Sequence, residues 1–167
     1  MSNLEDLKKQ AVELKQEFDT LFKRRTEETY EIEVSDAKFL TKMNKVIKSN
    51  LEWTGADSIG YTNVVHTFEK ETEGMKVEDG KLSIKAYLIE GLFFMLNRYK
   101  GVGYNAAKEF AEVMQPIQKT VSLLRIDDEK LKQYREQIGE IEMQISMIEN
   151  PEEEMITESN DNVETLN

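Results

Sequence analysis

The stretch that decides the fold is LEDLKKQAVELKQEFDTL, residues 4–21. Its apolar residues recur at alternating intervals of three and four, which is the heptad spacing of a coiled-coil helix. A second stretch, LKQYREQIGEIEMQISMI at residues 131–148, has the same spacing. The pattern predicts two long helices, over 3–25 and 127–149, whose seam residues are Leu4, Leu7, Ala11, Leu14, Phe18, Leu21, Leu131, Tyr134, Ile138, Ile141, Ile145 and Ile148.

Both predicted helices have suitable end residues. Ser2 and Glu5 fit a capping box at the start of the first helix, and Asp127 or Asp128 can cap the second. The basic run over residues 23–25 suits the negative end of the helix dipole, although it could also bind a phosphate or an acidic partner. At about 23 residues, or roughly 34 Å, each helix matches the other in length.

Charges beside the seam favour antiparallel packing of these two helices within one chain. A parallel self-pair of the second helix would oppose Lys130 and Arg135, and an antiparallel self-pair of the first would oppose lysines. Exposed ion pairs contribute only about 0.2–1 kcal/mol each, so the mismatches decide between the arrangements. The intramolecular pair has no like-charge contact and brings together Lys8 with Glu149, Lys15 with Glu142, and Glu17 with Lys130.

Residues 26–126 lie between the heptads and read as a mainly helical head. Residues 30–34 alternate with period two, which is typical of a short strand. A helix is expected from Ser35 or Asp36 to about Trp53. Another is expected over 57–74, although Gly60 weakens it and a strand over 64–68 is the alternative.

The second half of the head has a turn signal and a strongly apolar helix. Asp79-Gly80 lies between alternating flanks and favours a small hairpin over 76–84. Residues 86–99 are apolar nearly all round, which is typical of a central helix and predicts burial of Leu92 and Met95. A further helix begins near 104 and is expected to kink or break at Pro116.

The fold class predicted from these patterns is mainly α. We expect a helical bundle with an antiparallel coiled-coil pair of N- and C-terminal helices and a small β-hairpin, forming a single helical domain over 1–150. Residues 151–167 contain six acidic residues and no basic one after Asn150-Pro151, so a disordered acidic tail is expected there. Its Met155-Ile156 is a candidate partner-binding segment.

Composition excludes several classes of protein and site. The 167 residues include 22 basic and 33 acidic ones, a net charge of −11 that disfavours broad nucleic-acid binding and docking on anionic membranes. There is no cysteine, so disulfides and thiolate chemistry are excluded. The apolar run 86–96 is too short to span a bilayer, and MSNLEDLKKQ lacks a signal-peptide core. A cytoplasmic location, or one within a particle assembled in the cytoplasm, is expected.

The sequence contains no recognisable catalytic motif, so we expect that the protein is not an enzyme and has no cofactor or metal site. His66 is the only histidine, which leaves no pair for a zinc motif, and acidic runs such as 127–129 lack the spacing of an EF-hand loop. The glycines at 101 and 103 are explained by a helix stop rather than by a phosphate loop. Glu90 lies in the most apolar run, where burial would raise its pKa, but a polar contact or a wet edge is the preferred interpretation.

The function expected from the sequence is non-enzymatic protein–protein interaction or assembly. An accessory or structural subunit of a larger complex, a viral one included, fits the heptad pair and the acidic tail, with a partner bound through the head or the tail. A homo-oligomer is also compatible with the sequence, whereas direct nucleic-acid or membrane partners are not expected. The alternative is an acidic regulator or inhibitor that binds a basic site on a nucleic-acid-handling protein, which salt dependence would reveal.

Overall fold

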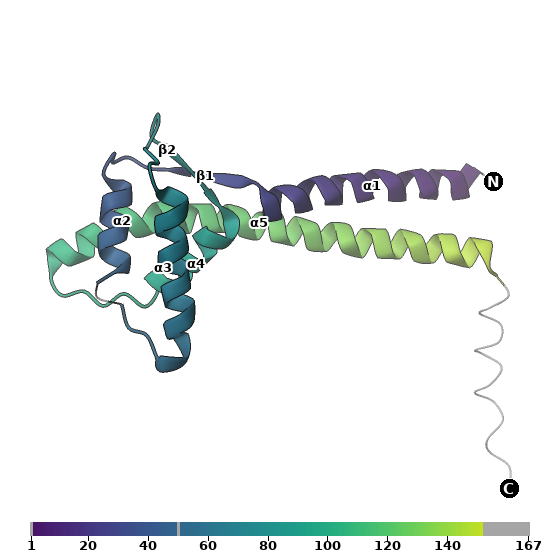
Figure 1. The fold of residues 1–167 in the computed structure, drawn as a ribbon. Coiled ribbons are helices and arrows are strands. Elements are labelled where there is room, and N and C mark those ends of the chain that lie inside the picture. The colour runs from purple at the N-terminus through teal and green to yellow at the C-terminus, as the bar shows by residue number, and fades with distance from the viewer. Residues whose placement is uncertain (1, 50, 152–167) are drawn as a thin grey trace, which may run out of the picture. The chain divides into compact units, whose positions relative to one another are not determined.

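The computed structural model of the chain describes residues 2–49 and 51–151 (Figure 1). The predicted tail therefore lies outside the described residues, apart from Pro151. The chain divides into two units. We call the described parts of residues 1–22 and 129–167 the two-helix unit, and Lys23–Asp128 the head unit. The described residues are mostly helical with one small antiparallel sheet, which confirms the mainly α fold class.

The two-helix unit pairs the N-terminal part of α1 (Ser2–Glu27) with the C-terminal part of α5 (Tyr104–Glu149). Lys8 contacts Glu149 and Lys15 contacts Glu142, so residue numbers rise along one helix as they fall along the other. The pair is therefore antiparallel, as the charges beside the heptads predicted. Neither these helices nor any other in the described chain is long and apolar enough to cross a membrane.

The sheet of the head unit consists of β1 (Thr29–Glu33) and β2 (Lys81–Lys85), paired antiparallel with Thr29 opposite Lys85. Each strand alternates between buried and exposed residues. The buried face carries Tyr30 and Ile32 from β1, and Leu82 and Ile84 from β2. The strand predicted over 30–34 is thus present, displaced by one residue, because its period-two pattern places alternate side chains in the core.

Asp79 and Gly80 form the tight turn that their sequence predicted. Both have positive φ, 49° and 73°, as a type I′ turn requires. An isolated β-bridge between Glu78 and Lys81 flanks the turn. Beyond it, β2 pairs with β1 and not with residues 76–78. The backbone N–H of Val34 also bonds to the carbonyl of Gly80, at 2.8 Å, which ties the turn to the end of β1.

Three shorter helices complete the head unit: α2 (Phe39–Ile47), α3 (Ser58–Thr72) and α4 (Ala86–Leu96), with a 3-10 turn η1 (Gly55–Asp57) before α3. The helix expected to reach Trp53 ends earlier, and Leu51 instead forms a β-bridge with Tyr99. The helix over 57–74 is confirmed, and the alternative strand over 64–68 is wrong. The helix predicted over 86–99 ends at Leu96, and residues 97–98 follow it as a turn before the bridge at Tyr99.

Helix α4 is central to the core of the head unit, as its composition predicted. Leu92 is fully buried and Met95 is 3% exposed. They pack in one cluster with apolar residues of α2, α3, α5 and the sheet, including Met43, Phe68 and Ile117. Burial of this cluster is the main source of the stability of the head unit.

Helix α5 continues through Pro116, so of the two outcomes expected there, a kink or a break, the break is wrong. Val113 and Ile117 on either side are fully buried, and their packing offsets the backbone hydrogen bond that a proline cannot donate. The expectation that Asp127 or Asp128 caps a separate helix is wrong for the same reason, because both lie inside α5. Asp127 is instead 4% exposed and bonds to other elements.

Candidate functional site

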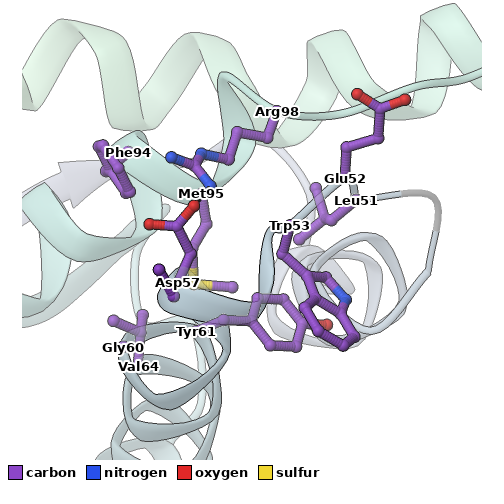
Figure 2. A pocket seen from close by; sticks show the side chains of 11 residues that line it. Leu51, Glu52, Trp53, Asp57, Gly60, Tyr61, Val64, Phe94, Met95 and Arg98 are labelled. Atoms are coloured by element: carbon purple, nitrogen blue, oxygen red, sulfur yellow. Dashed lines mark hydrogen bonds and ion pairs between the residues drawn. The ribbon is translucent and has the colours of Figure 1, made fainter.

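The head unit contains a cavity of about 220 Å³ between the 51–57 segment, α3 and α4 (Figure 2). The lining is predominantly apolar and aromatic, with ionised groups at Glu52, Asp57 and Arg98. Its residues are Leu51, Glu52, Trp53, Ala56, Asp57, Gly60, Tyr61, Val64, Phe94, Met95 and Arg98. This combination of a concave apolar wall and a few polar groups is typical of binding sites.

Trp53 and Tyr61 form one aromatic wall of the cavity (Figure 2). Their ring centroids are 6.3 Å apart and their planes differ by 19°, so the rings are stacked. The Tyr61 hydroxyl donates a 2.6 Å hydrogen bond to the carbonyl of Ile47 at the end of α2, which fixes the ring. Trp53 remains 54% exposed and is the only tryptophan of the chain.

The other wall is built around Arg98. Its guanidinium lies 4.6 Å from the centroid of Phe94 and donates a 2.5 Å hydrogen bond to Asp57 Oδ2. The same carboxylate oxygen accepts a 2.7 Å hydrogen bond from the Thr54 hydroxyl. Arg98, and secondarily Thr54, lowers the pKa of Asp57, so this carboxylate is ionised at neutral pH. Phe94, held under a fixed cation, is still 59% exposed.

The cavity is electrically balanced. Arg98 is paired with Asp57, and Glu52 is paired with Lys100 at 3.0 Å. An occupant therefore meets aromatic faces and two neutralised ion pairs instead of a net charge. A cavity of about 150 Å³ is known to hold a benzene ring, whereas sites for whole small molecules run to about 300–1,000 Å³. The volume and the charge balance suit one large uncharged side chain.

Gly60 opens the floor of the cavity. A Cβ added at this position would meet no atom within 4 Å, so the missing side chain leaves open space beside Tyr61 and Val64. Gly60 is the only signal in the sequence that pointed here, since it weakened the helix prediction. The rest of the site was missed, because Asp57 and Arg98 are 41 residues apart and no local pattern connects them.

The other sequence candidates lie elsewhere. His66 is exposed on α3 and does not line the cavity. Within residues 2–49 and 51–151, no group of three or more metal-ligating side chains comes together. Gly103 has φ of 87° just before α5, which explains its position by backbone conformation.

Glu90 lies on an exposed edge of α4, with its side chain 45% exposed. Its carboxylate accepts a 2.5 Å hydrogen bond from Arg25, whose Nε donates to Asp128 Oδ1 at 2.8 Å. The neighbouring Arg24 pairs with Asp127. Two members of the basic run, Arg24 and Arg25, thus lie in the last turn of α1, where the dipole interpretation placed them, and both bind carboxylates of α4 or α5.

Asp127 and Tyr30 form a buried contact that the sequence did not reveal. The Tyr30 hydroxyl donates a 2.7 Å hydrogen bond to Asp127 Oδ2, across 97 residues of sequence. Burial, and then this hydrogen bond, raise the pKa of Tyr30 from 10.0 to about 12. With the Arg24 contact, Asp127 joins β1, α1 and α5 within the head unit.

The seam residues of the two-helix unit differ in burial. Ala11 and Ile141 are buried, at 6% and 7% exposed, and Ile148 is 45% exposed. Nine are half-buried: Leu4, Leu7, Leu14, Phe18, Leu21, Leu131, Tyr134, Ile138 and Ile145.

The contacts beside this seam match the predicted charges in two of three cases. The expected pairs Lys8–Glu149 and Lys15–Glu142 are present, at 2.5 and 2.6 Å. The third expectation is wrong: Glu17 accepts a hydrogen bond from the Tyr134 hydroxyl, which raises the pKa of Tyr134, and forms no ion pair with Lys130 in the described residues.

No protein-family model matches the chain, and no significant match occurs among curated proteins or solved structures.

Proposed function

We propose that this protein is a non-enzymatic interaction or assembly protein whose head unit binds a partner segment by one large uncharged side chain. The observation that carries the proposal is the cavity walled by Trp53, Tyr61 and Phe94. Partly exposed aromatic residues around a desolvated pocket are the usual anchors of protein interfaces. The proposed setting is an accessory or structural subunit of a larger complex, such as a virus particle, in the cytoplasm or in a particle assembled there.

The polar groups support recognition rather than chemistry. Arg98 is engaged by Asp57 and Phe94, and the Asp57 carboxylate also accepts from Thr54. These contacts hold the groups in place around the cavity and leave their charges compensated. A partner side chain can therefore enter without stripping water from an unpaired charge, which would otherwise weaken binding.

The first test uses Trp53 as an internal reporter. Neutral amides of leucine and phenylalanine are titrated while Trp53 fluorescence and protein NMR shifts are followed. Because a single side chain supplies little binding free energy, the expected Kd is on the order of millimolar. Shifts confined to cavity residues support the proposal, and no saturable change up to the solubility limit contradicts it.

A plug variant sharpens this test. Gly60→Leu should fill the open space and abolish the response, because its side chain extends into the cavity. Gly139→Leu is the matched control: this glycine is also helical and exposed, and its Cβ would likewise meet no atom within 4 Å. A plug variant that keeps the wild-type response would refute the proposed site.

The salt dependence of partner binding distinguishes the proposal from the alternative, in which the protein is an acidic regulator of a basic partner. That alternative rests on the net charge of −11. A partner from the native host that binds wild type and Gly139→Leu, but not Gly60→Leu, should stay bound as ionic strength rises. A steep loss of affinity with salt, unaffected by the plug, would favour the acidic regulator instead.

A further inference from the structure

Three side chains near the cavity are more exposed than any other large apolar or aromatic side chain in the described part of the chain. Val102 is 96% exposed, Tyr104 79% and Ile59 73%. Ile59 precedes Gly60 on α3, Val102 lies in the segment between α4 and α5, and Tyr104 is the first residue of α5. Single exposed apolar residues are common, whereas a group of them beside an apolar cavity marks an interaction surface.

The segment before α5 is attached to the rim of the cavity. Lys100 pairs with Glu52 at 3.0 Å, and the backbone N–H of Glu52 donates to the carbonyl of Arg98 at 3.1 Å. Four residues span at most about 14 Å, so the Cα of Tyr104 lies within that distance of the Cα of Lys100. Tyr104 does not line the cavity of its own chain. Its exposed ring is therefore available to another molecule that approaches the cavity.

The head unit differs in charge from the rest of the chain. Lys23–Asp128 contains 16 basic and 17 acidic residues, although the whole chain has a net charge of −11. The ranges that build the cavity and the segment before α5, 51–64 and 94–108, contain two acidic and three basic residues. Both acidic residues, Glu52 and Asp57, are paired with basic side chains, which leaves one exposed lysine. Two copies of this acidic chain can therefore meet here without opposing unpaired carboxylates.

We infer that Tyr104 of one copy enters the cavity of a second copy, and that the second copy returns the same contact. The inference rests on the proposed function, for which it names the partner. The cavity of about 220 Å³ exceeds the roughly 150 Å³ that holds a benzene ring. The tyrosine hydroxyl can hydrogen-bond to Asp57 or Arg98 in the wall, while the ring meets the aromatic faces. Because ring and cavity are neighbours in each copy, a single two-fold axis completes both contacts.

The first test is the mass of the protein in solution. One anchoring side chain alone binds in the millimolar range, and two contacts made together give an expected Kd on the order of 100 μM. Sedimentation equilibrium on the full chain from about 10 μM to about 1 mM brackets this value. The mass should rise reversibly from 19.4 kDa towards twice that value. A monomer throughout the range would overturn the inference.

Two variants separate the ring from the cavity. Tyr104→Ser removes the ring and keeps the cavity, and serine also suits the start of a helix. Gly60→Leu fills the cavity and keeps the ring. Each variant alone should be a monomer over the same range, and far-UV circular dichroism establishes that the helices of each are intact.

Mixing the variants tests the exchange directly. The ring of unlabelled Gly60→Leu can still enter the cavity of isotope-labelled Tyr104→Ser, so NMR shifts should appear at the cavity residues of the labelled copy. The unlabelled double variant Tyr104→Ser/Gly60→Leu offers no ring and should cause no shifts. Shifts of equal size with the double variant, or none with Gly60→Leu, would overturn the inference.

Tyr87→Ser is the matched control, because Tyr87 is 50% exposed on α4 and does not line the cavity. It should dimerise as the wild type does. A dimer that survives Tyr104→Ser, or that dissociates equally in Tyr87→Ser, would place the contact elsewhere and overturn the inference. A wild-type monomer whose Trp53 still responds to the neutral amides would also overturn it, but would leave the proposed function standing.

Discussion

Replacing Asp127 with alanine should destabilise the head unit far more than the same change at its neighbour Asp128. Asp127 is 4% exposed and accepts the Tyr30 hydroxyl at 2.7 Å as well as Arg24. Its removal leaves a buried hydroxyl without an acceptor, a cost of about 1–3 kcal/mol. The Arg24 side chain is 49% exposed, so its pair adds up to about 1 kcal/mol.

The expected loss is therefore about 1–4 kcal/mol in the free energy of unfolding. Urea unfolding followed by Trp53 fluorescence reports on the head unit alone, since this is the only tryptophan. With a denaturant slope of about 2 kcal/mol/M, a loss of 2 kcal/mol lowers the midpoint by about 1 M. Asp128→Ala removes a carboxylate that is 49% exposed and should cost at most about 1 kcal/mol.

A double-mutant cycle isolates the Tyr30 contact. In a Tyr30→Phe background, Asp127→Ala orphans no hydroxyl, so its cost should fall by about 1–3 kcal/mol. If Asp127→Ala costs no more than Asp128→Ala, or if the cycle gives a coupling below about 0.5 kcal/mol, the reasoning from buried hydrogen bonds is wrong here.

Three further results are expected. The pKa of Tyr30 is about 12 in the folded protein and 10.0 ordinarily, so its contribution to the free energy of unfolding is complete below pH 10 and is lost between pH 10 and 12. Urea unfolding at each pH should show this loss, and Tyr30→Phe should reduce it. Leu92→Ala should lower the free energy of unfolding by about 2–5 kcal/mol, whereas Glu90→Gln, at an exposed side chain, should lower it by at most about 1 kcal/mol. If thermal melts show equal losses for the two variants, the assigned burial is contradicted. Gly60→Ala should raise the free energy of unfolding by up to about 1 kcal/mol, because the added Cβ lies in open space on a helix. At Gly91 an added Cβ would lie 3.0 Å from a neighbouring valine methyl, so a gain of equal size in Gly91→Ala would be evidence against this packing.

Features that depend on local periodicity could be predicted from the sequence. The heptads identified α1 and the C-terminal part of α5, and the pairs Lys8–Glu149 and Lys15–Glu142 followed from their register. The Asp79-Gly80 turn was recognisable because both residues tolerate positive φ. The turn and the helices succeed because each depends on spacing within one segment, and the two ion pairs succeed because matching heptads fix the register between two helices.

Features that depend on distant residues could not be predicted in this way. The turn did not reveal that β2 takes β1 as its partner, and the helix patterns did not bring Arg98 to Asp57. Pro116 suggested a break because propensity ignores the burial of the residues around it. The cavity was missed since its walls come from separate elements.

The sequence separation of the contacts in the head unit has a consequence for synthesis on the ribosome. Glu31 and Lys81, which pair across the sheet, are 50 residues apart. At a translation rate of about 5–20 residues per second, β1 waits about 3–10 s for its partner strand, with its apolar face and its backbone edge unprotected. Tyr30 waits longer still, because its acceptor Asp127 is made 97 residues later. The nascent head unit therefore closes late, and β1 is the segment that a chaperone would have most reason to bind during translation.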